Sequence, residues 1–240
     1  MIGKSFRYRA VMCFSPQADL VGGVVIGAIG IDALRHVEKR ASHLAIAALP
    51  LVLAVHQLDE AFVWLGLEGH VAKSVEHFAL WIYLLIAFVL LPIYVPLAVM
   101  GYEPTARRKW GMSPFVAIGA YVSVVLSLAM LRGPFGVTMH PLHLSYNLRL
   151  GHAPIIVGLY VIAVCGAFLF SGIRPMVVFG LINLVAVIVI IFLSIDGFAS
   201  VWCAWAAISS GAIALRLRLQ ERHRLASAGA PDQHYLPHPT

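Results

Sequence analysis

Seven long stretches of mostly apolar residues dominate this 240-residue sequence. Each has about 20 residues or more, the length at which an α-helix crosses the hydrocarbon core of a bilayer. Hydrophobic residues make up 60% of the chain and charged residues 12%, whereas soluble domains carry about 25% charged residues. We therefore predict an all-α polytopic membrane protein, a bundle of seven transmembrane helices. The spans are expected at roughly residues 16–35, 43–66, 72–101, 112–132, 153–171, 175–194 and 198–217.

The residues at the ends of these stretches predict where helices begin and stop. Ser15 before Pro16 is a typical pair of N-cap and first helical residue, and Gly133 before Pro134 should end the fourth helix. Residues 1–15 then form a short N-terminal segment, and 16–217 form the transmembrane domain. The polar, Pro- and Gly-containing tail at 218–240 is expected to be disordered.

The distribution of Lys and Arg predicts the orientation in the membrane, because loops rich in these residues stay in the cytoplasm. One set of alternate loops holds eleven of them: Arg35, Lys39, Arg40, Arg107, Arg108, Lys109, Arg174, Arg216, Arg218, Arg222 and Arg224. The other set holds six: Lys4, Arg7, Arg9, Lys73, Arg132 and Arg149. We therefore expect the N-terminus outside and the C-terminus in the cytoplasm. The basic balance is explained by topology and by contact with anionic lipids on the cytoplasmic side, with no need for a nucleic acid.

The segment HQLDE places three ionisable side chains inside the second predicted span. A charged group there costs roughly 3 kcal/mol unless it is paired or hydrated, which makes each a functional candidate. His56, Asp59 and Glu60 are three and four residues apart, so they lie near one helical face. Counting residues from the predicted ends of helices 2 and 3 puts Glu60 and His77 at the same depth, and we expect these two to touch.

Three interpretations of this cluster remain open. In one, the side chains only bond each other across helices and specify packing. In another, His56, Glu60, His77 and His152 bind a metal, most plausibly zinc, with Glu60 and Asp59 as catalytic carboxylates. In the third, they line a path for protons or a substrate.

The loop between the fourth and fifth spans, residues 133–152, is the second informative segment. It is longer than most connections, and such loops are often functional. His140, His143 and Tyr146 lie in it, on the same outer side as the buried cluster. They are expected either to close over the cluster as a lid that contacts substrate or, because leucines alternate with polar residues, to lie at the membrane interface. Asp19 and Asp196 are further candidates on the outer side.

A resemblance supports part of this interpretation. The segments MCFSPQADLVGG and LPLVLAVHQLDEAFVWLGL resemble those of a bacterial family of multi-helix membrane proteins, which begin Met-Cys-Phe-Ser and carry a His/Gln-Gln-Leu-x-Glu segment in the second helix. The resemblance lies mainly in residues 12–70. It implies a bacterial cytoplasmic membrane, a translation start at Met12 in preference to Met1, and a Glu60 that belongs to the sequence pattern of the family. With that start, removal of the initiator methionine would leave Cys13 as an N-terminal nucleophile. The resemblance implies no activity.

Three functions are therefore compatible with the sequence. The first is a membrane hydrolase with an outward-facing zinc site that activates water. The second is a proton-coupled carrier of a small solute. The third is a structural or sensor protein in which the polar cluster only packs the helices.

Overall fold

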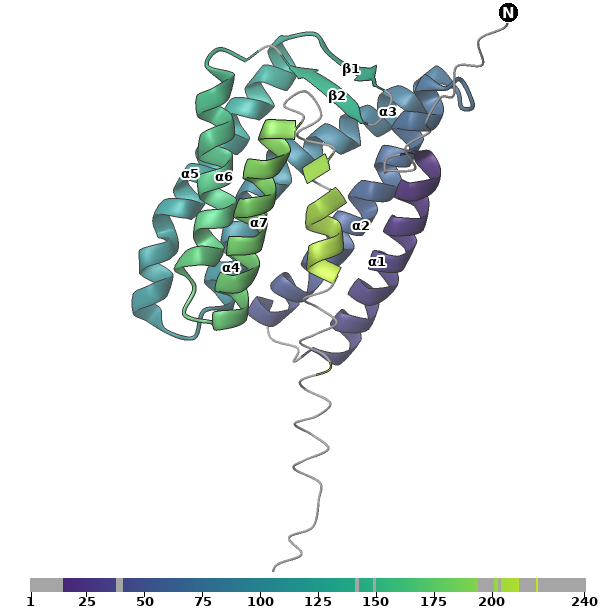
Figure 1. The fold of residues 1–240 in the computed structure, drawn as a ribbon. Coiled ribbons are helices and arrows are strands. Elements are labelled where there is room, and N and C mark those ends of the chain that lie inside the picture. The colour runs from purple at the N-terminus through teal and green to yellow at the C-terminus, as the bar shows by residue number, and fades with distance from the viewer. Residues whose placement is uncertain are drawn as a thin grey trace, which may run out of the picture.

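The computed structural model describes residues 15–37, 41–140, 143–148, 150–193, 201–202, 204–211 and 219. Its elements are α1 (Pro16–His36), α2 (Ala41–Leu67), α3 (Lys73–Leu84), the π-helix η1 (Leu85–Leu90), α4 (Leu91–Tyr102), α5 (Ala106–Arg132), β1 (Phe135–Met139), β2 (Leu144–Leu148), α6 (Ala153–Phe170) and α7 (Arg174–Leu193). The helices lie side by side as a bundle, and the two strands cross one end of it (Figure 1).

The described residues contain six helices that are long and apolar enough to cross a membrane. They correspond to the first six predicted spans, with α3, η1 and α4 together forming the third, Lys73–Tyr102. The chain thus has the character of a membrane protein with several spans. The seventh predicted span, 198–217, lies partly outside the described residues, although 201–202 and 204–211 are helical. The predicted tail lies outside them too, apart from Leu219.

The predicted ends of two helices are confirmed. Ser15 caps α1, since its hydroxyl accepts a hydrogen bond from the backbone N–H of Ala18 at 3.3 Å. Helix α5 ends at Arg132, with Gly133 as its C-cap. The start of α5 differs from the prediction, because the helix begins at Ala106 rather than near residue 112. Its first turns therefore carry the basic residues that the sequence had assigned to a loop.

The third span changes its helical pattern in the middle, at η1. The backbone N–H of Leu91 bonds to the carbonyl of Ile86, five residues back. Pro92 has no N–H to continue this pattern, which leaves the carbonyl of Ala87 without its backbone donor. The hydroxyl of Tyr160 in α6 supplies one at 2.8 Å. Such π-turns are common at functional sites, and this one faces the centre of the bundle.

Close approaches between helices rely on residues without a side chain. A Cβ added at Gly119 in α5 would overlap the carbonyl oxygen of Pro92. That carbonyl lacks a helical donor because Pro96, four residues on, has no N–H. Between α1 and α2, a Cβ at Gly30 would lie 2.9 Å from the backbone nitrogen of Leu51. Small residues that let backbones approach are the usual basis of helix association in membranes.

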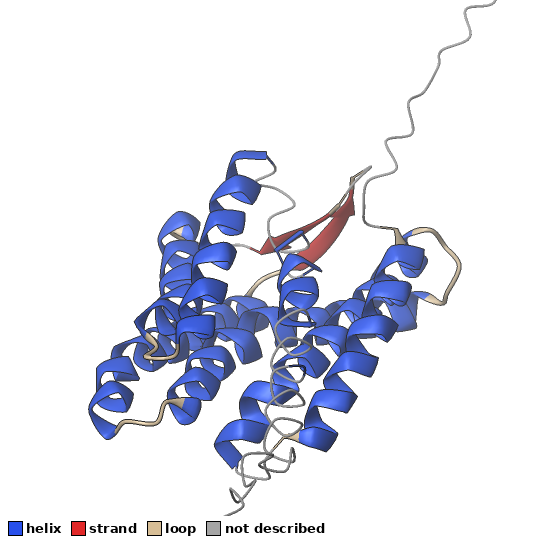
Figure 2. Cartoon of the chain, turned by 60° about the horizontal axis from the view of Figure 1, so that its bottom comes forward, coloured by secondary structure: helices blue, strands red, loops and turns tan. Residues whose placement is uncertain are grey.

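The loop between α5 and α6 is a two-stranded antiparallel hairpin, so the fold is not purely helical. Phe135 pairs with Leu148 and Met139 with Leu144. Leu144 is fully buried and packs against Val63 and Trp64 of α2. The hairpin therefore covers the ends of α2 and α3, as Figure 2 also shows. Alternation of Leu with polar residues at period two matches a strand with one buried face, and here that face is turned to the protein.

Candidate functional site

One face of α2 carries an apolar half and a polar half. Leu49, Leu53, His56 and Glu60 follow each other at intervals of three or four residues, so they line one face. All four are buried, and His56 and Glu60 are 0% exposed. The prediction that His56 and Glu60 share a buried face of the second helix agrees with this arrangement. Both ionisable groups are directed into the protein and not toward lipid.

Glu60 is bonded to the hairpin. The hydroxyl of Tyr146 in β2 donates a hydrogen bond to Oε1 of Glu60, with a distance of 3.3 Å between the two oxygens. Leu144 and Leu148, two residues to either side, hold the strand on the bundle. Tyr146 therefore reaches a carboxylate in the membrane-spanning part of the chain from outside the helices. This is the contact by which the loop acts on the cluster.

Three aromatic rings are stacked beside this contact. The ring of Tyr146 lies on that of Tyr83 in α3, with centroids 4.0 Å apart and an angle of 12° between the planes. Tyr83 in turn lies on His56, at 4.1 Å and 30°. The stack therefore joins β2, α3 and α2.

The imidazole of His56 has no hydrogen bond on either ring nitrogen within the described residues. Buried polar atoms are nearly always hydrogen-bonded, so an exception needs a specific explanation. The ring stacks on Tyr83, and no hydrogen bond within the described residues occupies its nitrogens. Asp59 differs from His56 in burial, because its side chain is only half-buried. Like the His56 nitrogens, its Oδ2 has no hydrogen-bond partner within the described residues.

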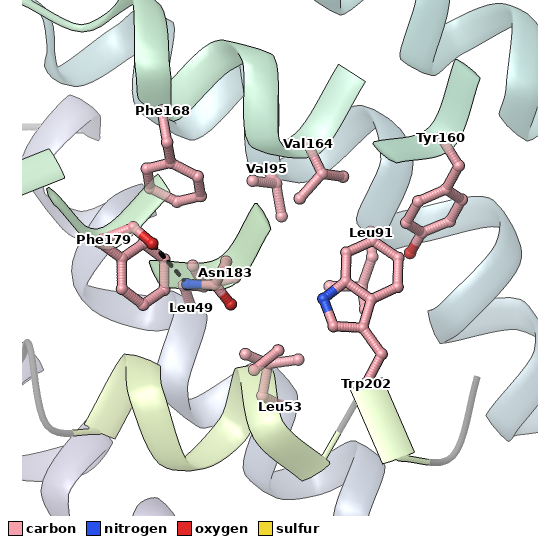
Figure 3. Close-up of a pocket in the computed structure, with 11 residues that line it drawn as sticks. Leu49, Leu53, Leu91, Val95, Tyr160, Val164, Phe168, Phe179, Asn183 and Trp202 are labelled. Atoms are coloured by element: carbon pink, nitrogen blue, oxygen red, sulfur yellow. Dashed lines mark hydrogen bonds between the residues drawn. The ribbon is translucent and has the colours of Figure 1, made fainter. Parts of the chain in front are cut away.

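A largely apolar cavity begins at Leu53, about one turn along α2 from His56. The volume of this cavity that is open to the centres of water molecules is about 40 Å³. About 10–15 Å³ is enough for one water. Figure 3 shows the side chains around it, with the amide of Asn183 among apolar groups. Its lining comes from α2, α4, α6, α7 and the 201–211 segment: Leu49, Leu53, Leu91, Val95, Tyr160, Val164, Phe168, Phe179, Asn183, Trp202 and Ala206. Hairpin, Glu60, His56 and cavity thus follow one another along the face of α2.

Asp19 lies on the other side of α2. It is buried in the first turn of α1, and its Oδ1 accepts a hydrogen bond from Nε2 of Gln57 at 3.0 Å. Gln57 is next to His56 in sequence and therefore points about a quarter-turn away from it. Asp19, which the sequence placed on the outer side, therefore lies at the interface between α1 and α2. Its partner Gln57 is next to His56 in α2.

The expected metal site is not supported. Among the described residues, no group of three His, Cys, Asp or Glu side chains is placed to hold a metal ion. The predicted set was His56, Glu60, His77 and His152, all of which are described. His77 is exposed and its ring lies against Phe135, with centroids 6.1 Å apart. Equal depth, counted along two helices, did not fix the direction in which His77 points, while Glu60 is turned into the bundle.

The remaining predicted residues lie at the edge of the site or outside the described chain. His152 is exposed and has a left-handed backbone (φ 59°) before the first turn of α6. His140 and His143 stack on each other near the hairpin turn, with centroids 4.8 Å apart. Of the loop residues proposed to act as a lid, only Tyr146 is placed in contact with Glu60 by a described bond. Cys13 and Asp196 lie outside the described residues.

Sequence patterns did not single out Tyr83, nor Glu103 at the opposite end of the bundle. Glu103 is buried and accepts hydrogen bonds from the hydroxyl of Ser171 at 3.0 Å and from the N–H of Gly172. It thereby fastens the turn between α6 and α7 to the turn after α4. The one signal in the sequence was an acidic residue next to the basic run ARRK. Tyr83 had none, because tyrosines in spans are usually packing residues.

Comparison with known proteins gives a family and no activity. No curated protein matches the chain, and no solved structure matches it either. A model of a family of unknown function, DUF6629, matches residues 12–229. The match begins at Met12 and takes in the whole of the described polar cluster and the cavity. The chain belongs to this family.

Proposed function

We propose that this protein is a proton-coupled carrier, which exchanges protons for a small solute that has an apolar body and a cationic group. The observation that carries the proposal is the order of groups along α2. A buried carboxylate, Glu60, lies beside stacked aromatic rings and one to two turns from an apolar cavity. Intramembrane ionisable groups of this kind mark ion and substrate pathways.

The chemistry of the site selects the solute class. A carboxylate attracts a cation, and the faces of Tyr83 and Tyr146 attract it further through their ring quadrupoles. The cavity offers apolar walls for the remainder of the solute. Because a proton and a cation compete for one carboxylate, binding of either displaces the other. That competition is the coupling that an exchanger requires.

The hairpin and His56 act as the gates in this proposal. Tyr146 holds the hairpin over Glu60 while its hydroxyl is bonded there. His56 comes between Glu60 and the cavity-lining Leu53 along α2; its ring stacks on Tyr83, and its nitrogens have no hydrogen bond within the described residues. Movement of the hairpin lets the cation reach Glu60, and rotation of His56 opens the way toward the cavity.

The membrane setting is part of the same proposal. Seven spans, an outer N-terminus and a cytoplasmic C-terminus place the hairpin outside a bacterial cytoplasmic membrane. The basic ends of α1, α5 and α7 then face the cytoplasm and contact anionic lipid headgroups. Protons would enter from the hairpin side.

Proton release on cation binding tests the carrier proposal. The purified protein in detergent and weak buffer is mixed with benzyltrimethylammonium, a small permanent cation that cannot itself donate a proton, and the pH is followed with a dye. Wild type should release close to one proton per chain. Glu60→Gln should release none, because its amide cannot ionise. Glu68→Gln, a change at an exposed carboxylate just past the end of α2, should behave as wild type.

Two results would overturn the proposal. Wild type that releases no proton has no such exchange, and an undiminished release from Glu60→Gln would place the exchange at another group. A zinc hydrolase remains as the second interpretation of the sequence, but the described residues offer it no ligand set.

A further inference from the structure

Asp19 and Gln57 form a buried pair that has one hydrogen bond and lacks a donor for its other two oxygens. Asp19 is 2% exposed and Gln57 is 3% exposed. The amide Nε2 of Gln57 donates to Oδ1 of Asp19 at 3.0 Å. The other oxygen of each side chain, Oδ2 of Asp19 and Oε1 of Gln57, is buried without a hydrogen-bond partner in the described residues. An ionised carboxylate and an amide carbonyl are both acceptors only, so neither can satisfy the other.

A single proton on Asp19 removes both deficits. As a carboxylic acid, Asp19 has an O–H that can donate from Oδ2 to Oε1 of Gln57. The amide continues to donate from Nε2 to Oδ1. Acid and amide are then joined by two hydrogen bonds, and every polar atom of the pair is used. The proton comes from the solvent and requires no further group.

The described elements that pack around the pair supply no Lys or Arg close to Asp19. Helix α2 has no Lys or Arg, and the Lys or Arg of α1 is Arg35, more than four turns from Asp19. From α2, the groups facing Asp19 are the uncharged Gln57 and the indole of Trp64. The titratable groups of α2 nearest in sequence are His56, Asp59 and Glu60, and the described 201–211 segment, which packs beside α1, has none. An unpaired carboxylate buried in this way is costly.

Close approach of α1 and α2 beside the pair also favours a proton over a hydrated cation as the bound species. One turn along α1 from Asp19, a Cβ added at Gly23 would lie 2.6 Å from the side chain of Leu58 and 3.1 Å from the carbonyl oxygen of Ala54. The two backbones are therefore in near contact beside the pair. A proton needs no volume of its own, unlike a hydrated cation or a solute.

We propose that Asp19 is a proton-binding site: in the folded protein its carboxyl group is protonated and, paired with Gln57 through two hydrogen bonds, it fixes α1 against α2. Loss of this proton sets a carboxylate against the carbonyl of Gln57 and separates the two helices at this end. The packing of α1 against α2 therefore depends on pH. The proposal does not rest on the role proposed for Glu60, because Asp19 bonds to Gln57 whereas Glu60 bonds to Tyr146.

Substitution with asparagine separates the protonated from the ionised state. The amide introduced by Asp19→Asn would have an NH₂ where the protonated acid has its O–H, so it can form the same two bonds with Gln57. We expect Asp19→Asn to unfold, at neutral and at mildly alkaline pH alike, at the denaturant concentration that unfolds wild type at neutral pH. Asp19→Ala and Gln57→Leu should both be less stable, since each leaves a buried polar partner unsatisfied. The loss of stability with rising pH that Asp19 causes should be present in wild type and in Gln57→Leu, which both keep the carboxyl group, and absent from Asp19→Asn and Asp19→Ala.

Infrared spectroscopy provides a readout that packing alone would not change. The carbonyl stretch of a protonated carboxylic acid is separate from the bands of carboxylates and amides, and it shifts in D₂O. The difference between wild type and Asp19→Asn in neutral buffer isolates the contribution of Asp19. We expect a carboxylic-acid band that is present in wild type and lost in the variant, and retained in Glu60→Gln.

The opposite results would overturn the proposal. No difference in the carboxylic-acid band means that Asp19 is ionised. So does an Asp19→Asn protein that is as unstable as Asp19→Ala, and if sodium or potassium chloride then stabilises wild type but not the variant, the carboxylate binds a metal cation instead of a proton. Failure of the Glu60 exchange experiment leaves all of these outcomes unchanged.

Discussion

Tyr146 is the residue on which the connection between the hairpin and the transmembrane core depends. Its ring is part of the stack with Tyr83 and His56, and its hydroxyl is the donor to Glu60. The two functions of the side chain can be separated, because phenylalanine keeps the ring and removes only the hydroxyl. A substitution of this one residue by phenylalanine therefore tests the hydrogen bond without a change in packing.

Tyr146→Phe should destabilise the protein by about 1.5 kcal/mol, since it removes a donor from a buried carboxylate. Hydrogen exchange at the amides of β1 and β2 should also become faster, because the hairpin loses a bond to α2. Unfolding in detergent by added SDS, followed by far-UV circular dichroism, measures the first effect. Tyr121→Phe is the matched control, since Tyr121 is 55% exposed on α5. Equal stability and exchange in the two variants would mean that the hydroxyl of Tyr146 does not hold the hairpin.

At the scale of elements, prolines determine how α4 packs against its neighbours. Pro92 and Pro96 each remove a backbone N–H from the third span. The carbonyl of Ala87 is then served by Tyr160, and the carbonyl of Pro92 is covered by Gly119 of α5. Ser123, one turn further along α5, donates to the carbonyl of Val89 at 2.7 Å. Side chains of α6 and α5 thus donate to the carbonyls of Ala87 and Val89 in this interrupted span, as a membrane setting favours.

Gly119→Ala should be destabilising by about 1–3 kcal/mol, because the added methyl group overlaps a backbone oxygen that cannot move aside. The helices would have to separate, and the bond from Ser123 to Val89 would lengthen. The same SDS unfolding experiment provides the measurement. Gly158→Ala in α6 is the control, since a Cβ there meets nothing within 4 Å, and it should be neutral or stabilising by up to about 1 kcal/mol. If both variants have wild-type stability, α4 and α5 do not pack at Gly119.

At the scale of the whole molecule, the bundle has two chemically different ends. The hairpin crosses one end of the bundle (Figure 1), and its Tyr146 bonds to the buried Glu60. The turns after α4 and α6, joined through Glu103, lie at the other. The basic residues at the start of α5 belong to that second end. This separation is what the positive-inside rule expects of a protein with one cytoplasmic and one external face.

Labelling of single cysteines tests the proposed orientation. In a variant without native cysteines, Thr138→Cys on the hairpin should react in intact bacterial cells with a maleimide that does not cross the membrane. Thr105→Cys, before α5, should react only after the cells are permeabilised. Both positions are exposed, so reactivity reports the side of the membrane and not burial. The reverse pattern would place the hairpin and Glu60 on the cytoplasmic side.

The sequence by itself determined the elements that depend on local composition. Continuous apolar stretches predicted six helices now seen in the described residues, because a spanning helix satisfies its own backbone and needs only length and apolar side chains. Ser15 and Gly133 likewise act within their own turns. Spacing also placed His56 and Glu60 on one buried face, since a helical period follows from the backbone alone.

Only the tertiary structure decided what these residues meet. The described donor to Glu60 is 86 residues away in sequence, and it reaches the site because the segment after α5 forms a hairpin and not the interfacial or loop structure that its pattern equally allowed. The contact predicted between His77 and Glu60 stays a prediction: His77 is exposed while Glu60 is buried, and depth along a helix does not fix the helix's rotation, which packing sets. For the same reason the stack of Tyr83 and the cavity that begins at Leu53 could not be predicted: each is formed by side chains from several helices, and their mutual arrangement is fixed by the close contacts between them.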